Sequence, residues 1–328
     1  MRLLILKSSS HGGLGDQLIA LNRALGLARL SNRRICVDWR DTPYCRNGSN
    51  LFDALFDLKD IAYHPVGLGF ELGDTIGEDV VPNSWSGNVG LSFSQMSTML
   101  GQFNWDREWA AQNLDASTDE ILGPASIAVI WNHCGFAINT DNGESWIRRY
   151  VAVKQCIQQD IDNFVEHTYD QKMIGLHVRR SNEQNLGAKT ADPGHCVEIV
   201  KTLRRSHPGA GVYLASDNSS MYSFIENAIG KIVVFPKWMP EPGVPLHFSG
   251  SQDERGMKIA VEALIEMRLL ATCDWIVRPR DSCYSIAASL FSDSSKCNVI
   301  VVQSHRAAGS PIHACRSMLS KLLKQPHK

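Results

Sequence analysis

The chain has 328 residues, more than one domain usually contains, so we expect two domains that each bury a core. Its composition, 44% hydrophobic and 20% charged residues, is that of an ordinary globular protein. The formal net charge of −1 argues against a general nucleic-acid or membrane-surface binder. Any site for an anion must therefore be local.

The cysteines and the amino terminus bear on location. The nine cysteines lack the paired short spacings of a zinc site or a small disulfide scaffold, which favours a reducing compartment. Residues 1–6 hold too short an apolar run for a signal peptide, and no stretch approaches the roughly 20 apolar residues that span a bilayer. We therefore expect a cytoplasmic protein with no membrane span and no nucleic-acid partner.

The first half of the chain predicts a βαβ unit, which is typical of a parallel sheet. A strand is predicted over residues 3–6, a helix from Asp16 to about residue 30, and a second strand over 35–38. The helix carries a core-facing stripe made of Leu18, Leu21, Leu25 and Ala28. Further on, the pattern predicts a short helix over 51–58, a strand over 127–131 and an amphipathic helix over 146–167.

The second half alternates more regularly between short apolar runs and helical patterns. The predicted strands cover residues 173–178, 212–215, 232–235, 275–277 and 299–302. The predicted helices cover residues 195–205, 219–229, 254–273 and 282–291, with a terminal helix from about residue 311. This order predicts an α/β fold with two Rossmann-like domains, residues 1–165 and 166–328, facing each other across a cleft.

A glycine turn separates the first predicted strand from its helix. Gly13 and Gly15 let the backbone pass close to a ligand, and the amides of a helix amino terminus favour anions. The turn lacks the G-x-G-x-x-G spacing of a dinucleotide fingerprint, which disfavours a nicotinamide dehydrogenase. Asp16 at this point is either a helix cap or a carboxylate facing a ligand.

Two adjacent arginines, Arg179 and Arg180, follow the predicted strand 173–178. Ligands of open α/β sheets bind at the carboxyl edge, and a guanidinium offers a fork of donors that matches phosphate oxygens. A surface salt-bridge pair is the alternative. The next strand ends in Ser216 and Asp217, of which Ser216 is the better candidate for a ligand contact and Asp217 the better candidate for a helix cap.

A third block combines a helix, a strand and a second helix start. Glu262 and Glu266 lie four residues apart on one helix face, either as a solvated stripe or facing a cleft. A carboxylate in a cleft suits guanine, which presents two adjacent N–H donors. Ser282, where the next helix begins, is placed to hold a phosphate by its amide and hydroxyl.

Taken together and in this order, residues 174–180, 212–217 and 263–282 resemble the motifs of the NodZ-like α1,6-fucosyltransferase family. Residues 13–16 and 37–40 add to the likeness. The resemblance implies a GT-B fold and an inverting transfer of fucose from GDP-fucose to a sugar hydroxyl, with O6 of N-acetylglucosamine as candidate acceptor. It also implies that no metal or other cofactor is needed, and that the partners are a GDP-sugar donor and a glycan acceptor.

The resemblance also assigns roles to individual residues. His177 and Glu266 would recognise guanine, Arg179 would clamp the diphosphate, Arg180 would lie near the β-phosphate and the sugar, and Ser282 would bind phosphate. Departure of GDP builds negative charge on the β-phosphate, and Arg179 is our first candidate to meet it.

The general base does not carry over from the family. The Lys and Glu implicated in the animal enzymes align near Glu183 and Gly187, so Glu183 is a candidate by proximity only, and a solvated loop carboxylate is the alternative. Asp16, across the cleft, is the second candidate. A transferase for another GDP-sugar and a non-catalytic nucleotide-sugar-binding protein remain open as alternative functions.

Overall fold

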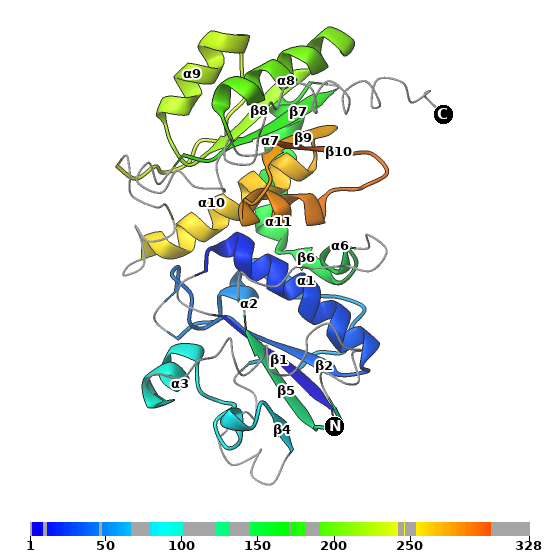
Figure 1. Cartoon of the computed structure of the whole chain (residues 1–328), viewed down its shortest axis with the longest axis vertical. Coiled ribbons are helices and arrows are strands. Elements are labelled where there is room, and N and C mark those ends of the chain that lie inside the picture. Colours follow the sequence, from blue (N-terminus) through cyan, green and yellow to red (C-terminus); the bar gives the residue numbers. More distant parts are fainter. Residues whose placement is uncertain are drawn as a thin grey trace, which may run out of the picture.

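The computed structural model describes residues 2–8, 12–45, 48–66, 79–100, 123–131, 145–170, 172–180, 191–241, 246 and 254–302. Two halves are stacked along the long axis of the molecule, each around its own sheet (Figure 1). The first sheet has the strand order β2-β1-β5-β4 and the second has the order β10-β9-β7-β8. All pairings within these two sheets are parallel, as the alternation of strands and helices predicts.

The first half contains the first sheet and a small antiparallel pair, β3 with β6. Its strands are β1 (Leu3–Lys7), β2 (Arg34–Asp38), β3 (Phe56–Leu58), β4 (Val80–Val81), β5 (Ile127–Trp131) and β6 (Val151–Val153). Its helices are α1 (Leu14–Leu30), α2 (Leu51–Leu55), the 3₁₀ turn η1 (Asn83–Trp85), α3 (Phe93–Leu100) and α6 (Trp146–Tyr150). The predicted stripe of α1 is fully buried, because it packs against this sheet.

The second half is the more regular of the two. Its strands are β7 (Met173–Val178), β8 (Gly211–Ser216), β9 (Trp275–Pro279) and β10 (Asn298–Val302). Its helices are α7 (Gln155–Thr168), α8 (Pro193–Ser206), α9 (Ser220–Ile229), α10 (Glu254–Ala271) and α11 (Cys283–Phe291). Both β7 and β8 are buried along their whole length, as expected of central parallel strands.

The prediction of one amphipathic helix over 146–167 is wrong. The segment forms α6, then β6, then α7, because Val151 and Val153 extend and pair with β3. The amide of Lys154 then donates to the carbonyl of Leu55 at 3.0 Å, which holds the break in place. Helix α7 packs on α10 of the second half.

Two smaller predictions are also corrected. The helix predicted over 51–58 ends at Leu55, since Phe56 adopts extended backbone angles and begins β3. The strand predicted over 232–235 is reduced to a single parallel bridge between Val233 and Tyr213, before the chain reaches Pro236, which has no amide to donate. The terminal helix predicted from about residue 311 lies outside the described residues.

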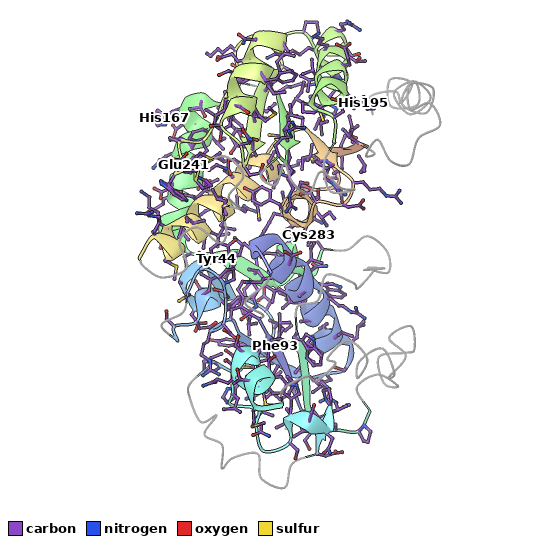
Figure 2. The ribbon with its side chains drawn as sticks, turned by 60° about the vertical axis from the view of Figure 1, so that its left-hand side comes forward. Tyr44, Phe93, His167, His195, Glu241 and Cys283 are labelled. Atoms are coloured by element: carbon purple, nitrogen blue, oxygen red, sulfur yellow. The ribbon has the colours of Figure 1, made fainter. Side chains whose placement is uncertain are left out.

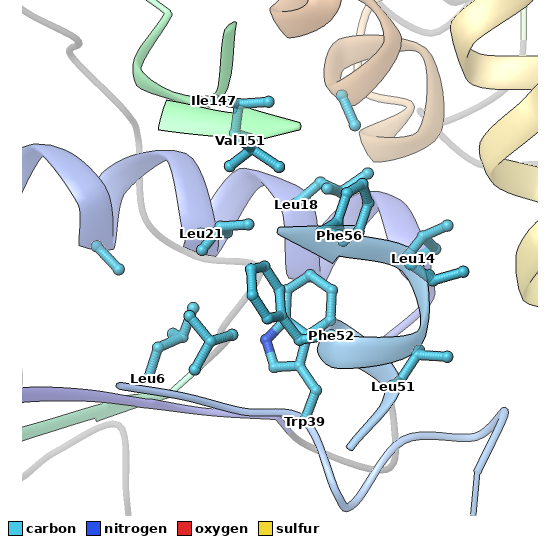
Figure 3. Packing of buried hydrophobic residues seen from close by; sticks show 14 of the residues in the cluster. Leu6, Leu14, Leu18, Leu21, Trp39, Leu51, Phe52, Phe56, Ile147 and Val151 are labelled. Carbon is cyan, nitrogen blue, oxygen red and sulfur yellow. The ribbon is translucent and has the colours of Figure 1, made fainter. Parts of the chain in front are cut away.

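One hydrophobic cluster runs through both halves. It contains β1 and α1 together with α10 and α11 (Figure 3 shows its aromatic centre around Trp39, Phe52 and Phe56). Phe56 of the first half stacks on Phe291 of the second, with ring centroids 6.5 Å apart. The two sheets therefore share a core at the place where they meet.

The two halves approach each other closely at Gly15. A Cβ added there would lie 2.7 Å from the backbone carbon of Cys283 and 2.7 Å from the backbone nitrogen of Tyr284. Real Cβ atoms essentially never approach other atoms so closely, so only glycine lets the first turn of α1 abut the first turn of α11.

A buried ionic network closes the carboxyl edge of the first sheet. The ammonium of Lys7 donates to Asp38 at 2.6 Å and to the carbonyls of Val89 and Leu91 at 2.7 and 2.8 Å. Arg40 binds both carboxylate oxygens of Asp38, at 2.7 and 2.8 Å. Burial lowers the pKa of Lys7, whereas the pKa of Asp38 is lowered by Arg40 and Lys7 in spite of burial. Every donor of the Lys7 ammonium is used, so the network fastens the 89–91 segment to the sheet.

Candidate active site

A pocket that is partly open to solvent lies where the two halves meet. The first half contributes Gly13, Leu14, Gly15, Asp16 and Tyr44. The second half contributes His177, Arg179, Ser216, Asp217, Lys237, Leu246, Ala263, Glu266, Cys283 and Tyr284. Tyr44 and Cys283, one from each half, mark this junction in Figure 2. Elements that are distant in sequence thus bring seven of the predicted residues to one place: Gly13, Gly15, Asp16, His177, Arg179, Ser216 and Glu266.

Glu266 lies at the buried end of this pocket. One face of α10 carries it toward the 237–238 loop, and its side chain is 2% exposed. Its Oε2 atom accepts from the ammonium of Lys237 and, at 3.1 Å, from the hydroxyl of Tyr284, while Oε1 has no partner among the described residues. Burial raises the pKa of Glu266, and Lys237 and Tyr284 oppose that shift by favouring the carboxylate.

His177 is the penultimate residue of β7 and is 4% exposed. Its ring stacks on Tyr284 with centroids 5.1 Å apart, and its Nδ1 atom has no partner within the described part of the chain. Burial lowers the pKa of His177 to about 3, although the charge of Asp217 acts in the opposite direction. The imidazole is therefore neutral at physiological pH and offers one donor and one acceptor.

The paired arginines separate at the end of β7. Arg179 lines the pocket, as predicted, and is its only guanidinium among the described lining residues. Arg180 is not part of the lining. Its backbone amide donates to Asp217 at 2.7 Å, so Asp217 ties the ends of β7 and β8 together and does not cap α9 as predicted. Ser219 occupies the N-cap position of α9, and Oδ1 of Asn218 accepts from the amide of Ser220 at 2.9 Å.

Two predicted phosphate or ligand contacts prove to have different surroundings. Ser216 lines the pocket, but its hydroxyl donates to the carbonyl of Val178 at 2.8 Å and accepts from the amide of Asn218 at 3.2 Å. Ser282 is the residue before α11, as predicted, but it is fully buried and does not line the pocket. Its hydroxyl has no partner among the residues described.

The opposite wall is the amino terminus of α1. The helix begins at Leu14, two residues before the predicted start, and Asp16 accepts from the amide of Gly13 at 2.9 Å. The amide of Leu14 donates to the hydroxyl of Tyr44 at 3.1 Å. The position of Asp16 is therefore compatible with both predicted roles, a helix cap and a carboxylate facing a ligand. The amides of Gly13 and Leu14 at the start of the helix already have acceptors within the protein.

Lys237, Tyr284 and Tyr44 are among the lining residues that were not predicted from the sequence. Lys237 lies in a proline-rich loop without a motif, and a lysine in such a loop is ordinarily exposed. Tyr284 directly follows the predicted Ser282 block on α11, so its position near the site could have been inferred from that helix start.

Glu183, the other candidate base, lies outside the described residues. Within the described ranges, no group of three or more His, Cys, Asp or Glu side chains is placed to hold a metal ion. None of the helices that the structure describes is long and apolar enough to cross a membrane.

Two sheets of parallel strands, with a pocket between the halves, define a glycosyltransferase fold of the GT-B type. The sequence profile of the family described as Nodulation protein Z (NodZ) matches residues 3–301, and the chain belongs to this family. It is therefore a member of a glycosyltransferase family. The predicted fold class and family resemblance are both confirmed.

Among curated relatives, Nodulation protein Z of Azorhizobium caulinodans is 25% identical over 300 residues, which cover 86% of this chain and 88% of the relative. Nodulation protein Z of Sinorhizobium fredii is 26% identical over 302 residues, covering 86% and 89%. The alignments thus extend over nearly all of both proteins.

Solved structures agree with this fold. Fucosyltransferase NodZ from Bradyrhizobium superposes with a TM-score of 0.64 at 20% identity, covering 89% of this chain and 93% of that one. NodZ α1,6-fucosyltransferase soaked with GDP-fucose gives a TM-score of 0.60 at 20% identity, covering 89% and 92%. A variant of Arabidopsis thaliana FUT1 in complex with GDP gives 0.54 at 14% identity, covering 92% and 70%.

Proposed function

We propose that this protein is an inverting, metal-independent transferase that moves fucose from GDP-fucose to a sugar hydroxyl. Relatives of the NodZ family support the donor, since one solved member was soaked with GDP-fucose. The observation that carries the proposal is the pocket itself, which brings His177, Arg179 and Glu266 of one half opposite Asp16 of the other.

The pocket residues divide into two ends with different chemistry. Glu266 and the neutral His177 provide acceptors and a donor for a purine edge, with Glu266 suited to the adjacent N–H donors of guanine. Arg179 provides the planar donor fork for the diphosphate. Negative charge that develops on the β-phosphate as the sugar departs is then met by a fixed cation, and removal of such a donor typically costs roughly 10² to 10³ in rate.

An inverting reaction also needs a base for the acceptor hydroxyl. We propose Asp16 as this base, because it is the pocket carboxylate contributed by the half opposite the donor residues. Glu183 stays a candidate on its sequence position. We propose that Arg180 lies near the sugar. We propose that Ser282 lies near the phosphate, because it precedes α11, whose first turn lines the pocket.

The acceptor and the location belong to the same proposal. We propose O6 of an N-acetylglucosamine as the acceptor, by resemblance to the family. A cytoplasmic location is supported by the nine cysteines of the sequence, which lack the paired short spacings of a zinc site or a small disulfide scaffold.

Turnover with purified protein tests the proposal directly. GDP release is followed with GDP-fucose or GDP-mannose, each with chitooligosaccharides as acceptor, in buffer that contains EDTA. We expect release with GDP-fucose only and no loss of rate in EDTA. Release with GDP-mannose only would reassign the donor, a loss of activity in EDTA would refute metal independence, and tight GDP binding without turnover for any pair would identify a binding protein.

The same preparation tests the phosphate assignment. Arg179→Ala is expected to lose GDP affinity, whereas Arg280→Ala should not, because Arg280 follows β9 and its side chain is 62% exposed. Normal binding of GDP by Arg179→Ala would show that the diphosphate does not lie against Arg179.

A further inference from the structure

Lys237 is a buried cation in the pocket that no motif of the sequence explains. Its side chain is 3% exposed, and its ammonium binds Oε2 of Glu266, which is its one hydrogen-bond partner among the described residues. An ammonium has three N–H donors, so two remain to be used. Oε1 of Glu266 is also unpartnered. The pair therefore presents spare donors beside a spare acceptor, both on residues that line the pocket.

Holding the loop in place does not require this pair. The amide of Trp238, the next residue, donates to Oε2 of Glu262 at 3.2 Å, and the guanidinium of Arg255 lies 5.2 Å from the centroid of the Trp238 ring. Glu262, one helical turn before Glu266, thus anchors the loop backbone to α10. Burial of an incompletely satisfied ion pair is costly in free energy, so a ligand that completes it would gain from both partners.

The edge of guanine has the complementary order of groups. It carries the O6 acceptor next to the N1–H and N2–H donors, whereas adenine places an amino donor where guanine has O6. A carboxylate alone reads only the N–H groups. An ammonium fixed beside that carboxylate adds the donor that O6 needs and repels the amino group of adenine.

We propose that Lys237 is a specificity-determining residue for the nucleotide, with its ammonium donating to O6 of guanine while Glu266 accepts from the N–H groups of the same edge. This inference rests on the proposed use of a GDP-sugar donor. The ammonium is held against Glu266, the residue assigned to guanine, and a contact with O6 is therefore favoured over a contact with the diphosphate. Lys237 and Glu266 would then select against adenine together, because the ammonium repels its amino group and the carboxylate finds no N–H donors to accept from.

Calorimetric binding of four nucleotides tests the contact at O6. GDP is compared with 6-thio-GDP, in which a weak sulfur acceptor replaces O6, with IDP, which keeps O6 and lacks the 2-amino group, and with ADP. The wild-type protein is expected to bind 6-thio-GDP roughly 10-fold or more weakly than GDP, since a hydrogen bond to a charged group is weakened. ADP should bind more weakly still.

The variant Lys237→Met preserves the length of the side chain and removes its charge. We expect its affinities for GDP and 6-thio-GDP to become nearly equal, while the penalty for IDP, which reports on Glu266, persists. Lys258→Met is the matched control. Lys258, like Lys237, pairs with a glutamate, in this case Glu262 four residues further along the helix, but its side chain is 70% exposed and lies outside the pocket. This control should keep the wild-type ratios.

Equal binding of GDP and 6-thio-GDP by the wild-type protein would overturn the inference, and so would a Lys237→Met protein that retains the full penalty for 6-thio-GDP. If Lys237→Met fails to fold, as judged by circular dichroism, the wild-type ratio decides alone. Failure of the wild-type protein to bind GDP at all would instead overturn the proposed donor, and this inference with it.

Discussion

Replacing Gly15 by alanine is expected to force the two halves of the pocket apart. The added Cβ would lie 2.7 Å from backbone atoms of both Cys283 and Tyr284, and an ordinary contact begins at 3.4 Å. The first turns of α1 and α11 must then separate by about 0.7 Å, because backbone atoms cannot swing aside as a flexible side chain can. Residues of both turns line the pocket, so its width changes with them.

Two opposing terms set the size of the effect on stability. Overpacking of this kind typically costs about 1–3 kcal/mol, and exchanging glycine for alanine in a helix returns up to about 1 kcal/mol. The free energy of unfolding should therefore fall by roughly 0–2 kcal/mol. The effect on the transfer rate should be larger than the effect on stability, since a misplacement of about 1 Å can slow a reaction that depends on geometry by roughly 10²-fold.

The assay combines thermal unfolding with calorimetric binding of GDP and with transfer rates. Gly26→Ala is the matched control, because a Cβ there would also lie 2.7 Å from another atom, but that atom is Nε1 of the Trp146 side chain, away from the pocket. We expect Gly15→Ala to lose GDP affinity and transfer, and Gly26→Ala to keep both. Undiminished GDP affinity and transfer in Gly15→Ala would refute the idea that this contact sets the pocket.

Three further predictions concern the buried charges and the base. Lys7→Met should lower the free energy of unfolding in urea by about 1–3 kcal/mol, because it leaves the carbonyls of Val89 and Leu91 without their donor while Arg40 still pairs with Asp38. Lys154→Met, which breaks an exposed pair, should change it by less than about 1 kcal/mol, and equal effects would contradict the assigned burial. Folding lowers the pKa of His177 to about 3, so between about pH 6.5 and pH 3 the unfolded chain binds a proton at this residue and the folded protein does not. The free energy of unfolding should therefore decrease as the pH falls through this range. His177→Gln should remove up to about 1.4 kcal/mol per pH unit of that slope, and an unchanged slope in unfolding experiments would argue against a neutral buried imidazole. Asp16→Asn should bind GDP normally but transfer fucose roughly 10²-fold or more slowly in single-turnover experiments, whereas Glu183→Gln should keep the wild-type transfer rate. Loss of transfer in Glu183→Gln but not in Asp16→Asn would identify Glu183 as the base.

The sequence predicted the pocket well where local rules and topology agree. Arg179 follows from a strand whose carboxyl end meets the sheet edge, and helical spacing places Glu262 and Glu266 on one face. The choice of His177 and of Glu266 rests on the family resemblance. The two glutamates do share a face, and each binds the loop that follows Val233. Because the strands of the sheet are parallel, their carboxyl ends lie at one edge, and residues far apart in sequence meet there.

The remainder depends on contacts that no local pattern encodes. The break between α6 and α7 is decided by pairing with β3, almost a hundred residues earlier. Lys237 is buried only because Glu266 meets it, and a charged residue in a loop is ordinarily solvated. Ser282 was placed correctly at the start of α11, but packing buries it outside the pocket lining.

The shared core between the sheets restricts how this enzyme could be recombined with its relatives. A chimaera that exchanges the first half would have to carry with it the side chains that face α10 and α11, above all Phe56 opposite Phe291 and the glycine at position 15. A graft that joins the chains at the linker alone would leave two mismatched apolar surfaces in contact. Changes within the first half are thus easier for the fold to accommodate than replacement of that half as a unit.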